Sequence, residues 1–190
     1  CRSATSTPPA PEGSRATRVV AIIGPPNYGK STLFNRLTGL RQKVANFPGV
    51  TVERRIGRAK VGGDREVFVI DLPGVYSLDP RSEDERVTHD VLQGQAEGVA
   101  RPDAILLILD STNLGRHLAL AAPILSLGLP TLVVLNRADA LRGRGGKVDV
   151  DELAKHIGAP VALISAARGE GVNTVFKFLA GRVAVPVPVE

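Results

Sequence analysis

A glycine-bounded loop at residues 24–31, with the sequence GPPNYGKS, constrains this chain more than any other feature. The loop matches the pattern G-x-x-x-x-G-K-[ST], whose backbone N–H groups cradle phosphate oxygens. The apolar run VVAII precedes it at residues 19–23, and the helical pattern STLFNRL follows from residue 31. A strand, a phosphate-binding loop and a helix must therefore follow one another here, which predicts an α/β fold.

The residue types in this loop suit the charge of a nucleoside triphosphate. Gly24 and Gly29 allow a tight turn whose N–H groups point inward at the positive end of the next helix. Lys30 can reach the β- and γ-phosphates, and the Ser31 hydroxyl can bind Mg²⁺. The nucleotide-binding residues expected in this segment are Gly24, Asn27, Tyr28, Gly29, Lys30, Ser31 and Thr32.

The composition fits one soluble domain. The chain has 190 residues, of which 43% are hydrophobic and 23% are charged, as in ordinary globular proteins. The longest apolar run, residues 104–109, is too short to cross a bilayer, and the only cysteine, Cys1, can form no internal disulfide. Part of the net charge of +5 lies within residues 1–18. We therefore expect neither a nucleic-acid partner nor direct membrane contact.

Strand and helix patterns alternate through residues 18–181, which we interpret as the folded domain. Residues 1–17 have the composition of a disordered leader, and residues 182–190 form a Pro-rich tail. Residues 40–51 are expected to be irregular. Strands are predicted at residues 19–23, 52–60, 66–71, 104–110, 131–136 and 161–165, and helices at 31–39, 82–95, 114–127, 150–157 and 171–179.

This order predicts a three-layer α/β sandwich with a mostly parallel, six-stranded sheet and helices on both faces. The loops rich in Gly, Asp, Asn and Lys then fall at the carboxyl ends of strands, where such folds bind ligands.

Residues 136–139, with the sequence NRAD, indicate which base is bound. Asp139 follows a buried strand and can accept hydrogen bonds from guanine N1–H and its exocyclic amine, whereas adenine offers an acceptor at N1. The pattern N-x-x-D is similar to the guanine-specificity motif of the GTPase superfamily. By this resemblance Asn136 braces the loops and the stem of Arg137 covers the base.

Ser165, Ala166 and Ala167 end the last predicted strand and resemble the partner motif, in which a backbone N–H meets the guanine O6. Taken alone, N-x-x-D and S-A are common in helix caps and turns. In chain order after a phosphate loop, they favour GTP over ATP.

The segment DLPG at residues 71–74 supplies the remaining parts of a GTP site. Asp71 can hold Mg²⁺ through water, the Gly74 N–H can meet the γ-phosphate, and Thr51 is the natural second hydroxyl ligand. Loss of the γ-phosphate would release both loops, which predicts a switch between order and disorder. Val75 stands where Ras-like GTPases carry the glutamine that orients water, so we expect slow intrinsic hydrolysis.

Several segments together resemble the G domain of FeoB, the bacterial ferrous-iron transporter family. They are residues 41–54, 71–78, 82–87, 110–116 and 148–153, and the resemblance covers residues 18–181. It implies a P-loop GTPase that binds GTP or GDP at the cytoplasmic face of the bacterial inner membrane. The implied partners are a helical region and a transmembrane Fe²⁺ pathway, and self-association of the G domain stays open.

The same resemblance implies activation by K⁺, because FeoB-like GTPases use K⁺ in place of an arginine finger, with a phosphate-loop Asn as a ligand. Asn27 matches that position, and Asn46 is a second candidate. A cation there would neutralise charge in the transition state, with Lys30, Thr51, Gly74 and Asn27 as the catalytic set. The alternative is that Asn27 only stabilises the turn.

Two other functions compete with a regulatory GTPase of iron transport. One is a soluble GTPase of ribosome assembly or tRNA modification, although the sequence carries no RNA-binding module. The other is a GTP-binding module that does not hydrolyse. His89, His117 and His156 lack metal-ligand spacing, and we interpret them as surface or packing residues.

Overall fold

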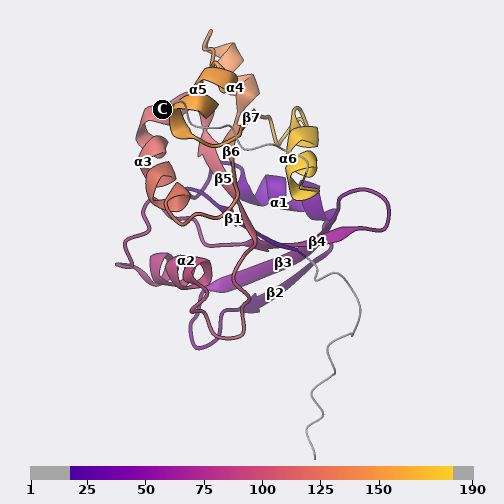
Figure 1. The fold of residues 1–190 in the computed structure, drawn as a ribbon, viewed down its shortest axis with the longest axis vertical. Helices are drawn as coiled ribbons and strands as arrows, with labels where there is room; N and C mark the ends of the chain where they lie inside the picture. The colour runs from indigo at the N-terminus through magenta and orange to yellow at the C-terminus, as the bar shows by residue number, and fades with distance from the viewer. Residues whose placement is uncertain (1–17, 182–190) are drawn as a thin grey trace, which may run out of the picture.

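One mixed sheet organises residues 18–181, the part of the chain that the computed structural model describes. The leader and the tail predicted at residues 1–17 and 182–190 lie outside the described residues. The strand order is β2-β3-β4-β1-β5-β6-β7 (Figure 1). The strands are β1 (Val19–Ile23), β2 (Gln42–Asn46), β3 (Glu53–Lys60), β4 (Glu66–Asp71), β5 (Ala104–Asp110), β6 (Thr131–Asn136) and β7 (Val161–Leu163).

The sheet is parallel except at one edge. Strand β1 pairs in parallel with β4 and β5, and the parallel pairing continues through β6 to β7. Strand β3 runs antiparallel to both β2 and β4. The loops after β1, β4, β6 and β7 therefore leave the sheet at the same edge, which is where an open α/β sheet binds its ligand.

Helices cover both faces of the sheet, as predicted. They are α1 (Lys30–Thr38), α2 (Glu83–Gln93), η1 (Ser111–Asn113), α3 (Leu114–Leu125), α4 (Ala138–Gly143), α5 (Val150–Ile157) and α6 (Val172–Leu179). The residues of β1 alternate between two cores: Val20 and Ile22 pack in one with Phe34 of α1, and Ala21 and Ile23 pack in the other with Leu120 of α3. Helices α1 and α6 lie on the first face, and α2, α3 and α5 on the second (Figure 1).

The prediction of six strands was wrong, because the described chain contains a seventh, β2, within the stretch expected to be irregular. Gln42 is half-buried and the next four residues are exposed. An edge strand held only through its pairing with β3 shows no alternation of apolar and polar residues, so its pattern could not be recognised. The prediction also missed the short helix α4, and several element ends differ by one or two residues.

The predicted capping box at the start of α2 is confirmed. The Glu85 N–H donates to the Ser82 hydroxyl over 3.2 Å, and the Ser82 N–H donates to the Glu85 carboxylate over 3.0 Å. This reciprocal pair fixes where the helix begins after the loop that follows β4. Of the helices within residues 18–181, none has the length and apolar character needed to span a membrane.

Candidate nucleotide site

The loop between β1 and α1 has the backbone that its sequence predicts. Gly29 has a φ of 89° and occupies the N-cap position of α1. A Cβ at this position would lie 2.1 Å from the side-chain nitrogen of Asn136, so only glycine fits. Because Gly29 has no side chain to cap α1, the first N–H groups of the helix remain to bind an anion.

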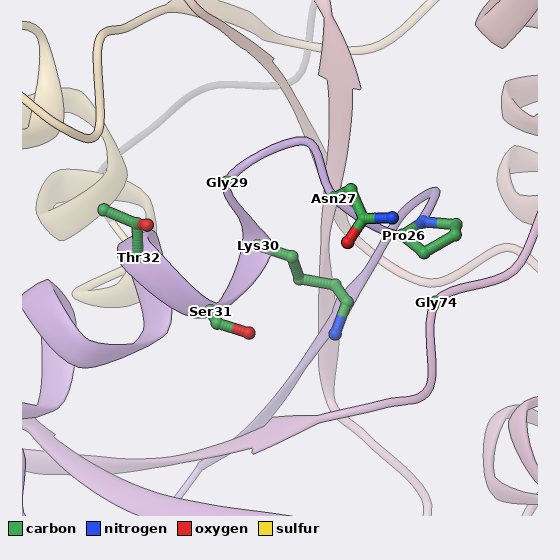
Figure 2. Close-up of a pocket in the computed structure, with 7 residues that line it drawn as sticks. All are labelled: Pro26, Asn27, Gly29, Lys30, Ser31, Thr32 and Gly74. Atoms are coloured by element: carbon green, nitrogen blue, oxygen red, sulfur yellow. The ribbon is translucent and has the colours of Figure 1, made fainter.

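Beside this loop lies a hollow of about 480 Å³, which we call the phosphate hollow. Figure 2 shows Lys30 extending into it, with the Ser31 hydroxyl beside the Lys30 chain and Thr32 projecting to the other side of the helix. The lining residues are Pro26, Asn27, Gly29, Lys30, Ser31, Thr32 and Gly74. The structure thus brings most of the residues predicted for phosphate binding around one cavity.

Lys30, which lines this hollow, forms a buried ion pair with Asp71. The Lys30 ammonium donates to the Asp71 carboxylate and, over 2.6 Å, to the backbone carbonyl of Leu72. These two acceptors compensate the desolvation of a buried lysine. A phosphate that binds Lys30 would therefore share it with Asp71 or displace it from Asp71.

Ser31 and Asp71 also line a second, smaller hollow of about 180 Å³. A hydroxyl and a carboxylate are the hard oxygen ligands that Mg²⁺ prefers, so these residues fit the predicted metal. Thr51, the other predicted ligand, is exposed in the loop between β2 and β3. Its hydroxyl donates to the Glu83 carboxylate over 3.2 Å, and it is not part of the lining that Ser31 and Asp71 share.

Gly74 lines the phosphate hollow and lies beside Pro26 of the phosphate loop (Figure 2). A Cβ on Gly74 would approach the Pro26 backbone to 2.7 Å, so a side chain would push the two loops apart. The next residue, Val75, donates its N–H to the Gly24 carbonyl over 3.1 Å. Its side chain is buried in the core with α2 and α3, and it has no group that could orient a water molecule.

A third hollow, of about 290 Å³, is lined by both predicted base-binding motifs, and we call it the base hollow. Asn136 connects them: its amide nitrogen donates to the Tyr28 carbonyl, and its amide oxygen accepts from the Ala166 N–H, both over 2.9 Å. The lining residues are Asn27, Tyr28, Gly29, Thr32, Asn136, Arg137, Asp139, Ala140, Ser165, Ala166 and Ala167. The bracing contact predicted for Asn136 is therefore present.

The carboxylate of Asp139 lies in the first turn of α4, within this third hollow. A hydrogen bond from the Ser165 side chain is the main influence that lowers the pKa of Asp139 below its ordinary value, with a smaller contribution from Arg168. A carboxyl group with an ordinary or lowered pKa is ionised at neutral pH, so Asp139 is suited to accept two N–H donors from one edge of a base.

Two interactions in this region could not be predicted from any sequence motif. The Arg137 guanidinium pairs with the buried Asp110 carboxylate over 3.0 Å, which fixes a residue that lines the base hollow. Arg36 of α1 donates to the carbonyls of Ala166 and Ala167. The sequence signals available were an Asp at a strand end and an Arg in a helix, and neither is distinctive.

His117 is a buried packing residue near the same hollow. Its ring meets Tyr28 edge-on, with centroids 4.6 Å apart, and its Nδ1 accepts the Asp110 N–H over 3.1 Å. Burial lowers the pKa of His117 below 6.5, more than the nearby Asp110 raises it. Within residues 18–181, no three or more His, Cys, Asp and Glu side chains gather in a way that could hold a metal ion.

Comparisons with known proteins agree with this geometry. The family model described as ferrous iron transport protein B matches residues 18–179. The Fe(2+) transporter FeoB of Salmonella typhimurium strain LT2 is 40% identical over 161 residues, which are 82% of this chain and 20% of that protein. The Escherichia coli K12 Fe(2+) transporter FeoB is 39% identical over the same length. The chain thus spans about a fifth of the curated relatives it matches.

Solved structures of G domains and cytosolic domains superpose on the described fold. A GDP-bound mutant of NFeoB from S. thermophilus has a TM-score of 0.79 and 43% identity, covering 90% of this chain and 66% of that one. The G domain of the T. maritima FeoB iron transporter has a TM-score of 0.76 and 37% identity, covering 87% of this chain and 98% of that one.

Proposed function

Because the chain belongs to the FeoB family of ferrous iron transport proteins, we propose that it binds and hydrolyses GTP as the regulatory G domain of an Fe²⁺ transporter. The observation that carries this proposal is the position of Asn136, which joins the phosphate loop to the loop that bears Ala166. One nucleotide could then contact Lys30 with its phosphates and Asp139 with its base.

Binding begins with the charge of the phosphates. The N–H groups at the start of α1 and the Lys30 ammonium attract the β- and γ-phosphates, and Lys30 exchanges Asp71 or Leu72 for phosphate oxygens. Ser31 and Asp71 would hold Mg²⁺, which supplies positive charge against the phosphates when bound. The Gly74 N–H contacts the γ-phosphate, so loss of that group loosens the loop that follows β4.

Guanine recognition depends on the ionised Asp139. Its carboxylate accepts the N1–H and the exocyclic amine, and the same pair of lone pairs would oppose the N1 acceptor of adenine. GDP should bind at least about a hundred-fold more tightly than ADP, since the unpaired buried groups in the wrong complex are costly. Isothermal titration with both nucleotides tests this, and equal affinities would refute guanine specificity.

The variant Asp139→Asn should bring the GDP affinity close to the ADP affinity, because the amide presents a donor to guanine N1–H in place of an acceptor. Lys30→Ala should abolish binding of both nucleotides. Unchanged GDP affinity in Lys30→Ala would refute the phosphate site itself.

Hydrolysis is slow without help, because Val75 is buried and cannot orient water. Asn27 fits a K⁺ site, since its exposed side chain carries an amide oxygen that can act as a metal ligand. The residue has a left-handed backbone, with a φ of 68°, within the turn of the phosphate loop. K⁺ bound there would supply positive charge against the negative charge that develops on the phosphate oxygens in the transition state. The catalytic set then consists of Lys30, Thr51, Gly74 and Asn27. Thr51 must break its hydrogen bond to Glu83 to join the other three.

The decisive experiment measures GTP hydrolysis with Mg²⁺ in KCl and in NaCl at equal ionic strength. We expect a K⁺-specific acceleration that Asn27→Ala removes, while Asn113→Ala, which changes an exposed asparagine that lines none of the three hollows, retains it. Equal slow rates in both salts would refute the role of Asn27 in ion binding and leave GTP binding intact.

In the full-length protein, the domain lies at the cytoplasmic face of the bacterial inner membrane. A helical region connects it to transmembrane segments that carry Fe²⁺. This part of the proposal rests on the curated relatives, which are named Fe(2+) transporters and of which the chain covers 20%. Fe²⁺ uptake by cells that carry Lys30→Ala in the full-length gene tests it, and normal uptake would refute GTP control.

A further inference from the structure

Arg36 reaches from α1 to the loop that follows β7. Its Nε donates to the Ala166 carbonyl over 2.6 Å, and its Nη2 donates to the Ala167 carbonyl over 2.8 Å. A Cβ on Gly169 would lie 2.8 Å from Nη1, so the guanidinium packs directly against the returning part of the loop. Arg36 itself does not line the phosphate hollow or the base hollow.

The peptide unit between Ala166 and Ala167 is the part of the loop that Arg36 controls. In a planar trans peptide, the carbonyl oxygen and the N–H of the next residue point in opposite directions. A bond that holds the Ala166 carbonyl toward Arg36 therefore turns the Ala167 N–H the other way. Because Ala167 lines the base hollow and Arg36 does not, an N–H directed away from Arg36 can face that hollow.

The preceding peptide is held independently, because the Ala166 N–H donates to Asn136 over 2.9 Å. Asn136 and Arg36 thus fix the two peptide planes on either side of Ala166. A cationic donor on the Ala166 carbonyl also polarises that peptide, which makes the Ala167 N–H a stronger donor.

We propose that Arg36 is a positioning residue that aims the Ala167 N–H at the 6-oxo group of the bound purine. The inference rests on the proposed guanine nucleotide site and adds to it a residue outside the base-binding motifs. Arg36 acts through the loop and touches neither the base nor the phosphates. Its removal weakens recognition of the 6-oxo group and leaves the contacts of Asp139 in place.

The loop retains its turn without Arg36. The Ser165 N–H donates to the Glu170 carbonyl over 3.0 Å, and the Gly169 N–H donates to the Ser165 carbonyl over 2.8 Å. Arg36 is exposed on α1, so its replacement leaves no cavity in the core. We therefore expect Arg36→Ala to fold, with a thermal midpoint within a few degrees of the parent protein.

The test compares two nucleotides that differ only at position 6. GDP carries oxygen there, and 6-thioguanosine diphosphate carries sulfur, a weaker acceptor, with N1–H and the exocyclic amine unchanged. Arg36→Ala should weaken GDP about ten-fold and the thio analogue by less than about three-fold, so that the preference for oxygen collapses. Titration measures the affinity of each variant for both nucleotides, and stopped-flow experiments measure the rates at which the nucleotides are released.

Two further variants separate the effect of the two-pronged guanidinium bond to Ala166 and Ala167 from the effect of the positive charge. Arg36→Lys keeps the charge but cannot span two carbonyls, so it should lose most of the preference for GDP over the thio analogue. Arg58→Ala removes an exposed arginine of β3, paired with Glu66, and should change neither affinity. If Arg36→Lys kept the full preference for GDP over the thio analogue, positioning by the two guanidinium hydrogen bonds would be overturned.

Equal loss for both nucleotides in Arg36→Ala, or no loss for either, would also overturn the proposal. If the parent protein itself failed to bind GDP, the proposed function would fail instead. The two failures are therefore distinguishable in one set of titrations.

Discussion

The amide nitrogen of Asn136 donates to the Tyr28 carbonyl over 2.9 Å, across 108 residues of sequence. Asn136 is 4% exposed, and its oxygen simultaneously accepts the Ala166 N–H. A single buried side chain thus sets the separation between the phosphate loop and the base-binding loop. Its close approach is also the reason that residue 29 must be glycine.

Asn136→Ala should therefore reduce stability and nucleotide binding together. The substitution leaves the Tyr28 carbonyl and the Ala166 N–H without their partner, so we expect a loss of about 2–3 kcal/mol in the free energy of unfolding. Urea unfolding measures the loss, and titration with GDP measures the weaker binding. Asn113→Ala is the matched control, because Asn113 is exposed and makes no side-chain bond at the start of α3. Equal effects of the two variants would contradict the bracing role of Asn136.

Gly74→Ala should separate the loop after β4 from the phosphate loop. The new methyl group would come within 2.8 Å of the Pro26 nitrogen, so the backbone must move, at a cost of about 1–3 kcal/mol. We expect a lower urea midpoint and slower GTP hydrolysis, since the Gly74 N–H would also shift.

Gly115→Ala provides the control for this change. Gly115 lies in α3, and a Cβ there meets no atom within 4 Å. Alanine is the better helix former, so this variant should gain about 0.5–1 kcal/mol of stability. A Gly74→Ala protein that is as stable as the parent would show that the two loops can separate without cost.

Protonation of His117 should destabilise the fold in mildly acidic solution. The unfolded chain binds this proton near pH 6.5, whereas burial lowers the pKa of His117 in the folded state. Protons therefore favour unfolding: the stability contribution of neutral His117 is complete above pH 6.5 and is lost as the pH falls through the lowered pKa. Urea unfolding measured from pH 7.5 down to pH 5 should show a decline that is smaller in His117→Gln.

The comparison for this experiment is His156→Gln, which changes an exposed histidine of α5. This variant should retain the pH dependence of the parent protein. An identical decline in His117→Gln and the parent would assign the pH dependence to other groups.

The buried strands and the site motifs could be predicted from the sequence for physical reasons. Strands β5 and β6 are continuous apolar runs, and every residue in them is buried, as expected for parallel strands covered on both faces. The motifs at residues 24–31 and 136–139 carry chemistry in a fixed local spacing. Their meeting around Asn136 follows from parallel topology, which sends their loops to one edge of the sheet.

The parts that sequence reasoning missed depend on contacts between distant segments. Strand β2 has no buried face to impose alternation, so only its pairing with β3 defines it. The contacts of Arg36 with the base-binding loop and of Arg137 with Asp110 join residues 130 and 27 positions apart. Long, flexible side chains reach many partners, and their spacing in sequence does not identify which one.

Ser82→Ala should destabilise α2 and, through it, the contact between Glu83 and Thr51. Ser82 accepts the Glu85 N–H over 3.2 Å, and loss of such a cap costs about 1 kcal/mol. The first turn of α2 would then fray, and the Glu83 carboxylate would no longer be held 3.2 Å from the Thr51 hydroxyl. Amide hydrogen exchange should speed up in the first turn of α2 and around Thr51.

Ser126→Ala separates this effect from the general loss of a serine. The Ser126 hydroxyl donates back to the Ala122 carbonyl at the end of α3 and caps no N–H group. Its removal should change the free energy of unfolding by less than about 0.5 kcal/mol. If exchange around Thr51 were the same in Ser82→Ala and Ser126→Ala, the start of α2 would not control the loop between β2 and β3, and Thr51 would be free to leave Glu83 without any change in the helix.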